Sequence, residues 1–452
     1  MDKTIPMTSP AGEGSGLRRE LGLLDATMIN AGTMIASAIF IVPSAITAGL
    51  GASVPSVLVW VLGGLVSMAG ALCVAELGAA MPEAGGQYVY LQRAYGPVVG
   101  FLYGWGAFLV INTASIAAIA VGFATYLGFF TPLDAFGVKL VAVASIVLLT
   151  VINCFGLRVG ATTQNVLTSL KIGALVAIVV LGFGLSGGST ANLMPAWPPG
   201  GAGALAAGIG PALVAVLWAY DGWIESSYVG GEVRDPGRVL PLSIVLSVVM
   251  VAVLYVVVVA AYTWLLPVER LAASPLVASD AMTVVVGSAG AGFVAAAILV
   301  STLGANNGIV FTSARIPYAM AEEGLFFRWA SRLHPRTRSP VLTLLVQGAV
   351  AAALTLTGSY VQLATYVVFV SFLFYALSAA AVIVLRRREP DMPRPYRAWG
   401  YPVTPLLFIG FALYLVLDTI VHTPRDSAIG AGLLAAGLPA YWYWQHTARR
   451  AH

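Results

Sequence analysis

The stretch AGTMIASA, residues 31–38, lies in the middle of the first long apolar run of the chain. A second stretch of small and polar residues, WAYDGW at residues 218–223, lies in the middle of the sixth apolar run. Interrupted helices at corresponding places in two halves of a membrane protein are typical of inverted-repeat transporters, which bind substrate at such breaks. Close helix packing, which Gly and Ala also permit, is the alternative interpretation.

The composition is that of a membrane protein. Of the 452 residues, 59% are hydrophobic and 9% are charged, whereas an ordinary soluble domain carries roughly 25% charged residues. The apolar runs are long and unbroken, which favours transmembrane helices over the alternating strands of a transmembrane barrel. We therefore expect an all-α polytopic membrane protein.

Twelve apolar runs predict twelve transmembrane helices. The runs lie at residues 23–48, 53–78, 97–129, 137–156, 162–186, 204–230, 239–266, 288–319, 340–357, 361–385, 402–421 and 427–446. Because the two interruptions are five spans apart, helices 1–5 (23–186) and helices 6–10 (204–385) are predicted to form a 5+5 inverted repeat with broken helices 1 and 6. Two extra helices (402–446) follow, between terminal tails at 1–22 and 447–452.

The basic residues predict the orientation. With both termini in the cytoplasm, 19 of the 23 Lys and Arg residues fall on the cytoplasmic side, and only Lys139, Arg270 and Arg425 fall on the other side. This asymmetry follows the positive-inside rule. The net charge of +4 is thus explained by topology, so no nucleic-acid partner is expected. We expect a multi-pass protein of the plasma or inner membrane.

A broken helix can bind a zwitterion without a charged side chain. One half-helix offers free N–H groups to a carboxylate, and the other offers free C=O groups to an ammonium. We expect the Ser37 hydroxyl and nearby amides to face the carboxylate, and carbonyls near Met34 and Trp218 to face the ammonium. The residues predicted to form the site are Thr33, Met34, Ile35, Ser37, Ala38, Trp218, Ala219, Asp221, Trp223 and Asn307. Aromatic packing for Trp223 and interhelical pairing for Asn307 are the alternatives.

Ionisable residues inside a membrane are costly, which makes each a functional candidate. Lys171 lies within the span 162–186 and is predicted to serve coupling, either in the place of a sodium ion or as a proton carrier. Snorkelling to the interface is the alternative. Asp221 and Glu225 can pair with cations or couple protons, or can act only at a helix end. Glu76 is expected to pair with a cytoplasmic Arg.

No enzymatic chemistry is expected. The four histidines lie in loops or the tail, so neither a metal cluster nor a Ser/His/acid set can form at a common depth. The chain has no GxxxxGK[ST] motif, which argues against an ATP-driven pump. Cys73 and Cys154 both lie in apolar runs, so no structural disulfide is expected. We expect no metal, no cofactor and a secondary transport mechanism.

An ordered series of motifs carries a family resemblance. The series comprises GTMIASAIF at 32–40 with Pro43, AELG at 75–78, MPEAGGQY at 81–88, YGP at 95–97, QNVLTSLK at 164–171, AYDGW at 219–223, EVRDP at 232–236 and the run 307–315. In these motifs, and over nearly its whole length, the chain resembles the amino acid-polyamine-organocation superfamily. It is most similar to the L-type amino acid transporter-like permeases of that superfamily.

This resemblance implies a fold of the sodium-symporter type and specific site roles. Substrate α-groups would bind at residues 33–38, Trp218 would be an aromatic gate, and Lys171 would replace a sodium ion. The chain departs from the family at Ala36 and Ala38, where glycines are usual, and at Ile224, where larger L-type relatives often have Asn. Some animal relatives are tethered to a heavy chain by a cysteine, but the loop 130–136 has none, so no disulfide-linked heavy chain is expected.

We therefore expect a secondary active permease that moves small or medium neutral L-amino acids by alternating access. It should be independent of sodium and act as an exchanger or a proton symporter. If Asp221 or Glu225 points inward, the alternative is a cationic amino acid or polyamine transporter of the same fold. A channel or a non-transporting membrane sensor is the alternative from another class.

Overall fold

The computed structural model describes residues 16–185, 187–358 and 360–450, and these residues are helical with connecting loops. In chain order the α-helices are α1 (Leu23–Met34), α2 (Ala38–Leu50), α3 (Ser53–Ala80), α4 (Gln87–Tyr95), α5 (Pro97–Gly106), α6 (Thr113–Leu127), α7 (Ala135–Cys154), α8 (Leu157–Gly184), α9 (Gly201–Ala219), α10 (Glu225–Tyr228), α11 (Pro236–Leu265), α12 (Val268–Ala273), α13 (Val277–Val286), α14 (Ser288–Ser313), α15 (Arg315–Glu322), α16 (Val341–Thr357), α17 (Tyr360–Arg388), α18 (Val403–His422), α19 (Pro424–Ala435) and α20 (Gly437–Arg450). Four short helices join them: a π-helix, η1 (Ala107–Asn112), and the 3₁₀ helices η2 (Thr190–Leu193), η3 (Gly230–Glu232) and η4 (Arg328–Ser331).

The all-α membrane class is confirmed. Within the described residues, nine helices are long and apolar enough to cross a membrane, and the bent pair α1 and α2 makes a tenth candidate. The predicted span 340–357 corresponds to α16, which has 17 residues, and the predicted span 427–446 falls on α19 and α20. Helices α16, α19 and α20 are each shorter than the roughly 20 residues that a crossing helix usually has. The number of twelve transmembrane helices therefore stays a prediction.

The first predicted interruption is present. Helix α1 ends at Met34, the chain passes through an extended Ile35, and α2 starts at Ala38 with its axis bent by 45°. Gly32, in the last turn of α1, has no room for a Cβ because the Thr168 and Gln164 side chains of α8 lie against it. The glycine therefore lets α1 approach α8 closely, just before the break.

The second interruption is also present, and it touches the first. Helix α9 ends at Ala219, and the helix resumes only as the single turn α10 after Gly222. Gly222 has φ 116°, a conformation that side-chain-bearing residues rarely adopt. A Cβ at Gly222 would lie 2.9 Å from the Met34 amide nitrogen, so the backbones of the two breaks meet at this point.

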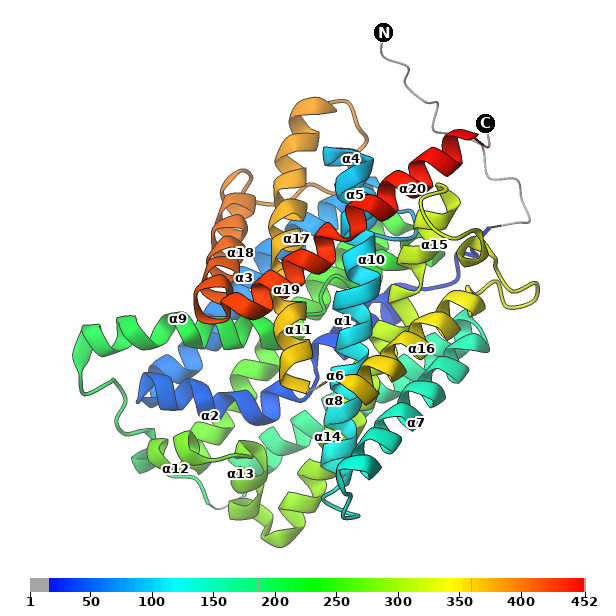
Figure 1. The fold of residues 1–452 in the computed structure, drawn as a ribbon. Coiled ribbons are helices and arrows are strands. Elements are labelled where there is room, and N and C mark those ends of the chain that lie inside the picture. Colours follow the sequence, from blue (N-terminus) through cyan, green and yellow to red (C-terminus); the bar gives the residue numbers. More distant parts are fainter. Residues whose placement is uncertain (1–15, 186, 359, 451–452) are drawn as a thin grey trace.

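The helices next to the two breaks pack against several other helices (Figure 1). Helix α1 packs against α8, α11 and α14, and the one-turn α10 packs against α1 and α14. Beyond the breaks, α2 and α9 extend side by side. Large apolar side chains on the outer helix faces, such as Leu65 and Val180, are exposed, as expected where lipid surrounds the protein.

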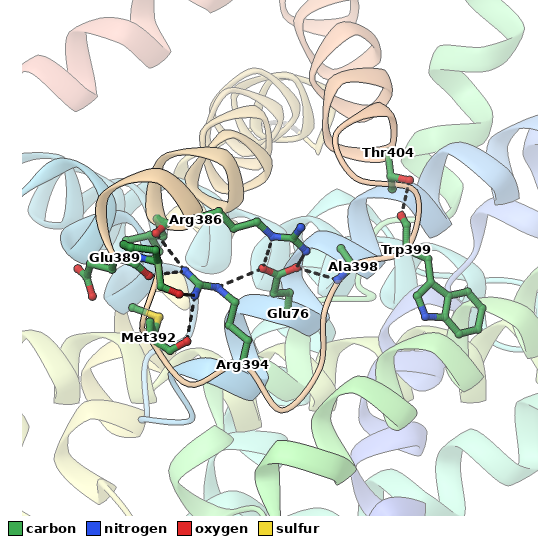
Figure 2. A network of polar contacts seen from close by, with 10 residues as sticks. Glu76, Arg386, Glu389, Met392, Arg394, Ala398, Trp399 and Thr404 are labelled. Carbon is green, nitrogen blue, oxygen red and sulfur yellow. Dashed lines mark hydrogen bonds and ion pairs between the residues drawn. The ribbon is translucent and has the colours of Figure 1, made fainter.

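Glu76, at the end of α3, pairs with arginines as predicted (Figure 2). Its carboxylate lies 2.6 Å from Arg386 Nη2 at the end of α17 and 3.5 Å from Arg394 Nε in the following loop. It also accepts a hydrogen bond from the Ala398 amide at 2.7 Å. The Arg386 guanidinium lies over the Tyr401 ring at 4.1 Å. One buried carboxylate thus joins α3, α17 and the loop that leads to α18.

Replacing Glu76 by Gln should destabilise the folded protein. Two guanidinium groups would lose their counter-charge in a buried place, and breaking a buried pair costs roughly 3 kcal/mol or more. The melting temperature of the purified variant measures this effect, with Glu269→Gln, a change at an exposed residue of α12, as the control. Equal melting temperatures for both variants would contradict the role assigned to Glu76.

Candidate substrate-binding site

A cavity of about 120 Å³ lies at the meeting point of the two breaks. Both breaks, η1, α6, α14 and α17 contribute to its wall. The lining residues are Thr33, Met34, Ala36, Ser37, Ala38, Ile111, Asn112, Ser115, Ala118, Ile119, Gly122, Trp218, Ala219, Asp221, Gly222, Glu225, Tyr228, Thr302, Ile309 and Tyr375. The cavity is therefore built from segments far apart in the sequence, and the broken spans supply part of its polar lining.

Seven of the ten residues predicted for the site line this cavity. They are Thr33, Met34, Ser37, Ala38, Trp218, Ala219 and Asp221. Four of them flank or form the first break, and the other three belong to the second. The amides at the start of α2 are first-turn amides, which have no partner within their own helix, and Ser37 and Ala38 bring this helix start to the cavity wall.

The structure places Ile35, Trp223 and Asn307 outside the cavity lining. Ile35 is fully buried and contributes its carbonyl to other contacts. The Trp223 ring packs against Tyr375 and Phe408. The Asn307 amide donates to Gln164 Oε1 at 2.8 Å and its oxygen accepts from Asn153 at 2.9 Å. Asn307 thus joins α14 to α8 and α7, in agreement with the alternative interpretation that it pairs helices instead of binding substrate.

Lys171 binds the first break directly. Its Nζ donates to the carbonyls of Gly32 at 2.6 Å, Ile35 at 2.8 Å and Ser301 at 3.0 Å, and the side chain is fully buried. Gly304 makes room for it, because a Cβ there would lie 2.7 Å from Lys171 Cε. Three converging carbonyl oxygens are also the kind of ligand set that a hard cation takes. The ammonium therefore fills a cation position between α1, α8 and α14.

Other carbonyls of the breaks are also hydrogen-bonded. The Tyr255 hydroxyl of α11 donates to Met34 O at 2.9 Å and lies 3.4 Å from Ala219 O, so it bridges the two breaks. The Ser301 hydroxyl lies 3.0 Å from Ile35 O and 3.1 Å from Ala36 O. These contacts satisfy backbone groups that have no water partner inside a membrane. They also hold the breaks open in one defined shape.

Two carboxylates face the cavity. Asp221 accepts from the Tyr375 hydroxyl at 2.7 Å and from the Gly222 amide at 2.9 Å. Glu225 is buried and accepts a hydrogen bond from the Thr312 hydroxyl. Within the part of the chain that the structure describes, no Lys, Arg or His forms an ion pair with either carboxylate. Both acids point inward, which was the condition for a cationic substrate.

Several lining residues were not predicted from the sequence. Asn112 ends the π-helix η1 in the third apolar run, and a polar residue in such a run was a signal that could have found it. Tyr375 and Tyr228 line the wall from α17 and α10. Aromatic residues occur throughout membrane helices, so no sequence signal distinguishes these two from packing residues.

Buried polar contacts close the cavity toward the predicted cytoplasmic side. Asn30 of α1 exchanges two hydrogen bonds with Ser226 of α10, at 3.0 and 2.7 Å. Beyond them, Arg315 and Glu232 form an ion pair at 2.8 Å in which both side chains are 1% exposed. On the opposite side, a second hollow of about 490 Å³ shares Ser37 with the cavity wall. The described conformation is therefore closed at one end and hollowed at the other.

Comparison with known proteins identifies the fold. The family model described as amino acid permease matches residues 21–438. The rabbit (Oryctolagus cuniculus) large neutral amino acids transporter small subunit 2 is 33% identical, covering 98% of this chain and 84% of the relative. The human b(0,+)-type amino acid transporter 1 is 31% identical, over 98% and 91%. The serine/threonine exchanger SteT of Bacillus subtilis (strain 168) is 30% identical, over 95% and 98%.

Replacing Lys171 by Met should strongly slow amino acid transport without unfolding the protein. The methionine fills a similar volume but removes the ammonium that binds three carbonyls. The first break would then shift, and misplaced substrate-binding groups lower a transport rate by roughly 100-fold. Lys139→Met is the matched control, because that lysine binds the exposed end of α16 through Leu356 O. Counterflow uptake into proteoliposomes measures the effect. Equal rates for both variants would remove the role given to Lys171.

Proposed function

The chain belongs to the amino acid permease family, and we propose that it moves small or medium neutral L-amino acids across the cell membrane by alternating access. The observation that carries this proposal is the pair of touching helix breaks around a cavity of about 120 Å³. Such breaks present backbone groups to the α-carboxylate and α-ammonium that every amino acid shares. The small cavity volume favours a short side chain.

The carboxylate position in this proposal is the start of α2. The amides near Ser37 and Ala38 and the Ser37 hydroxyl would donate to the carboxylate, with the positive end of the helix dipole behind them. Ala36 and Ala38 narrow this position relative to glycine. The α-ammonium would bind near Asp221, because the Met34 and Ala219 carbonyls already interact with Tyr255. Trp218 would cover the bound side chain.

Lys171 supports sodium independence. Its ammonium donates hydrogen bonds to three carbonyl oxygens that could otherwise coordinate a sodium ion. We therefore propose that no sodium ion accompanies the substrate. Uptake into proteoliposomes distinguishes exchange from proton symport. We also propose that both termini are cytoplasmic, since this orientation agrees with the positions of the arginines.

The alternatives from other classes are less well supported. A channel needs a continuous pore, whereas the described cavity is closed at one end by Asn30, Ser226 and the buried Arg315–Glu232 pair. The name of the rabbit relative calls it a small subunit. The loop between α6 and α7 has no cysteine here, so we propose that this chain works without a disulfide-linked heavy chain.

Ligand-dependent melting of the purified protein tests the substrate class. Among the twenty amino acids and several polyamines, small and medium neutral L-amino acids should raise the melting temperature most, because ligands that bind the folded state stabilise it. Uptake of the best ligand into proteoliposomes should persist when sodium is replaced by choline. Uptake that requires trapped internal substrate identifies an exchanger, and uptake driven by an inward proton gradient identifies a symporter. Absence of any stabilising amino acid would contradict the proposal.

A cationic amino acid is the second candidate, because Asp221 and Glu225 line the cavity and no basic side chain among the described residues pairs with them. If this candidate holds, Glu225→Gln should weaken L-lysine or L-ornithine binding at least about tenfold, the typical contribution of a charged hydrogen bond, and leave neutral amino acids nearly unchanged. Competition for uptake measures both affinities, with Glu322→Gln, at the exposed end of α15, as control. Failure of L-lysine to compete with the wild type would exclude this candidate.

A further inference from the structure

A polar pocket of about 180 Å³ lies at the start of α8, outside the substrate cavity. Four segments meet there: the residues before α1, the turn between α7 and α8 with the start of α8, the end of η3, and the loop that follows η4. The lining residues are Arg18, Glu20, Phe155, Gly156, Leu157, Arg158, Glu232, Arg336, Thr337 and Arg338. This end of α8 lies on the predicted cytoplasmic side. The pocket therefore lies at the depth of the lipid headgroups of the cytoplasmic leaflet.

The pocket carries an excess of positive charge. Four arginines line it against two glutamates, and both glutamates already have partners. Glu20 pairs with Arg158 at 3.1 Å, and Glu232 pairs with Arg315, which lies outside the pocket lining. Among the described residues, Arg18 and Arg336 form no ion pair. Exposed basic groups that converge on one pocket attract a phosphate or another anion.

The helix start adds to this charge. Helix α8 has 28 residues, and its N-cap Gly156 provides no side-chain hydrogen bond, so the first amides stay free for an anion. Gly156 has φ 121°, and a Cβ there would lie 3.2 Å from Thr337 Cβ. The loop that carries Arg336 therefore packs directly over the helix start, which brings its guanidinium group to the same pocket.

An apolar hollow continues from the pocket along the same helix. Its volume is about 460 Å³, and its walls are Arg158, Val159, Thr162, Thr163, Val166 and Leu167. Arg158 belongs to both hollows. Val159 and Val166 are 43% and 53% exposed, and in the predicted orientation they would lie deeper in the membrane than Arg158. The basic pocket thus adjoins a shallow apolar groove on the exposed face of α8.

We propose that this pocket and groove bind one anionic phospholipid of the cytoplasmic leaflet. The phosphate group would lie between Arg18, Arg158, Arg336 and the first amides of α8, and one acyl chain would lie over Val159 and Val166. A free phosphate compound would use only the pocket, whereas a phospholipid uses both hollows. Because Arg158 also binds Glu20, next to α1, the lipid would connect α1 with the loop after η4.

Binding of lipids to the full-length purified protein in detergent tests the proposal. The probes are phosphatidylglycerol, phosphatidylcholine with the same acyl chains, and glycerol 3-phosphate, measured by native mass spectrometry. Phosphatidylglycerol should bind at least tenfold more tightly than the other two. The double variant Arg18→Gln/Arg336→Gln should weaken phosphatidylglycerol binding roughly 30-fold, since each arginine near an anionic lipid contributes about fivefold.

Two further variants separate this site from general surface charge. Arg387→Gln/Arg397→Gln removes the same charge from exposed residues at the end of α17 and in the following loop, and it should leave the affinity nearly unchanged. Val166→Trp fills the groove and should weaken phosphatidylglycerol but not glycerol 3-phosphate. Equal loss in the two double variants would overturn the proposal. Equally tight glycerol 3-phosphate binding would also overturn it, in favour of a soluble phosphate ligand.

Discussion

The contact between the Lys171 ammonium and three backbone carbonyls is the interaction on which the rest of the site depends. A helix broken at mid-membrane exposes polar backbone groups that lipid cannot hydrogen-bond. Lys171 binds Gly32 O and Ile35 O across the first break and Ser301 O on α14. Tyr255 supplies the matching contact between the first break and the second. With these donors in place, these carbonyls are paired, whereas the first-turn amides at the start of α2 have no partner within their own helix. The two breaks are therefore stabilised by side-chain donors and need no inorganic cation. This explains how unwound backbone can line a cavity inside the membrane.

The inner half of the sixth span explains how substrate binding and access can be linked. Helix α10 is one turn long, and nearly every polar group on it contacts another element. Glu225 binds Thr312 on α14, Ser226 binds Asn30 on α1, and the Tyr228 hydroxyl lies 2.8 Å from the Tyr103 hydroxyl on α5. These contacts all belong to the single turn α10. A movement of α10 that opened the cavity on this side would therefore have to break them together. Since Glu225 and Tyr228 also line the cavity, a ligand in the cavity would touch the element that holds this side closed. The second hollow beside Ser37 is lined largely by apolar side chains such as Phe40, Val121 and Ile298.

The sequence was sufficient for the parts of the site that violate ordinary membrane patterns. Small and polar residues in the middle of an apolar run located both breaks, and a lysine within a span marked Lys171 as a residue of interest. Glu76 and its arginine partner followed from the cost of an unpaired charge. Residues that obey ordinary patterns were not assigned correctly to the cavity wall. Trp223 packs against Tyr375 instead of lining the cavity, and Asn307 pairs with Asn153 and Gln164. Which face of a helix turns inward depends on contacts between distant segments, so Tyr375 and Asn112 became visible only in the fold.

The central claim of the proposal is that the two breaks bind the α-groups of an amino acid, the α-carboxylate through the backbone amides at the start of α2 and the α-ammonium near Asp221. Competition against uptake of the best amino acid substrate tests it most directly, with three compounds that share one side chain. These are the amino acid itself, its carboxamide, and its α-hydroxy acid, which lacks the ammonium. The account predicts that only the intact amino acid competes, with both analogues at least about tenfold weaker because each leaves a buried polar group unpaired. A carboxamide or hydroxy acid that competes as well as the amino acid would contradict it.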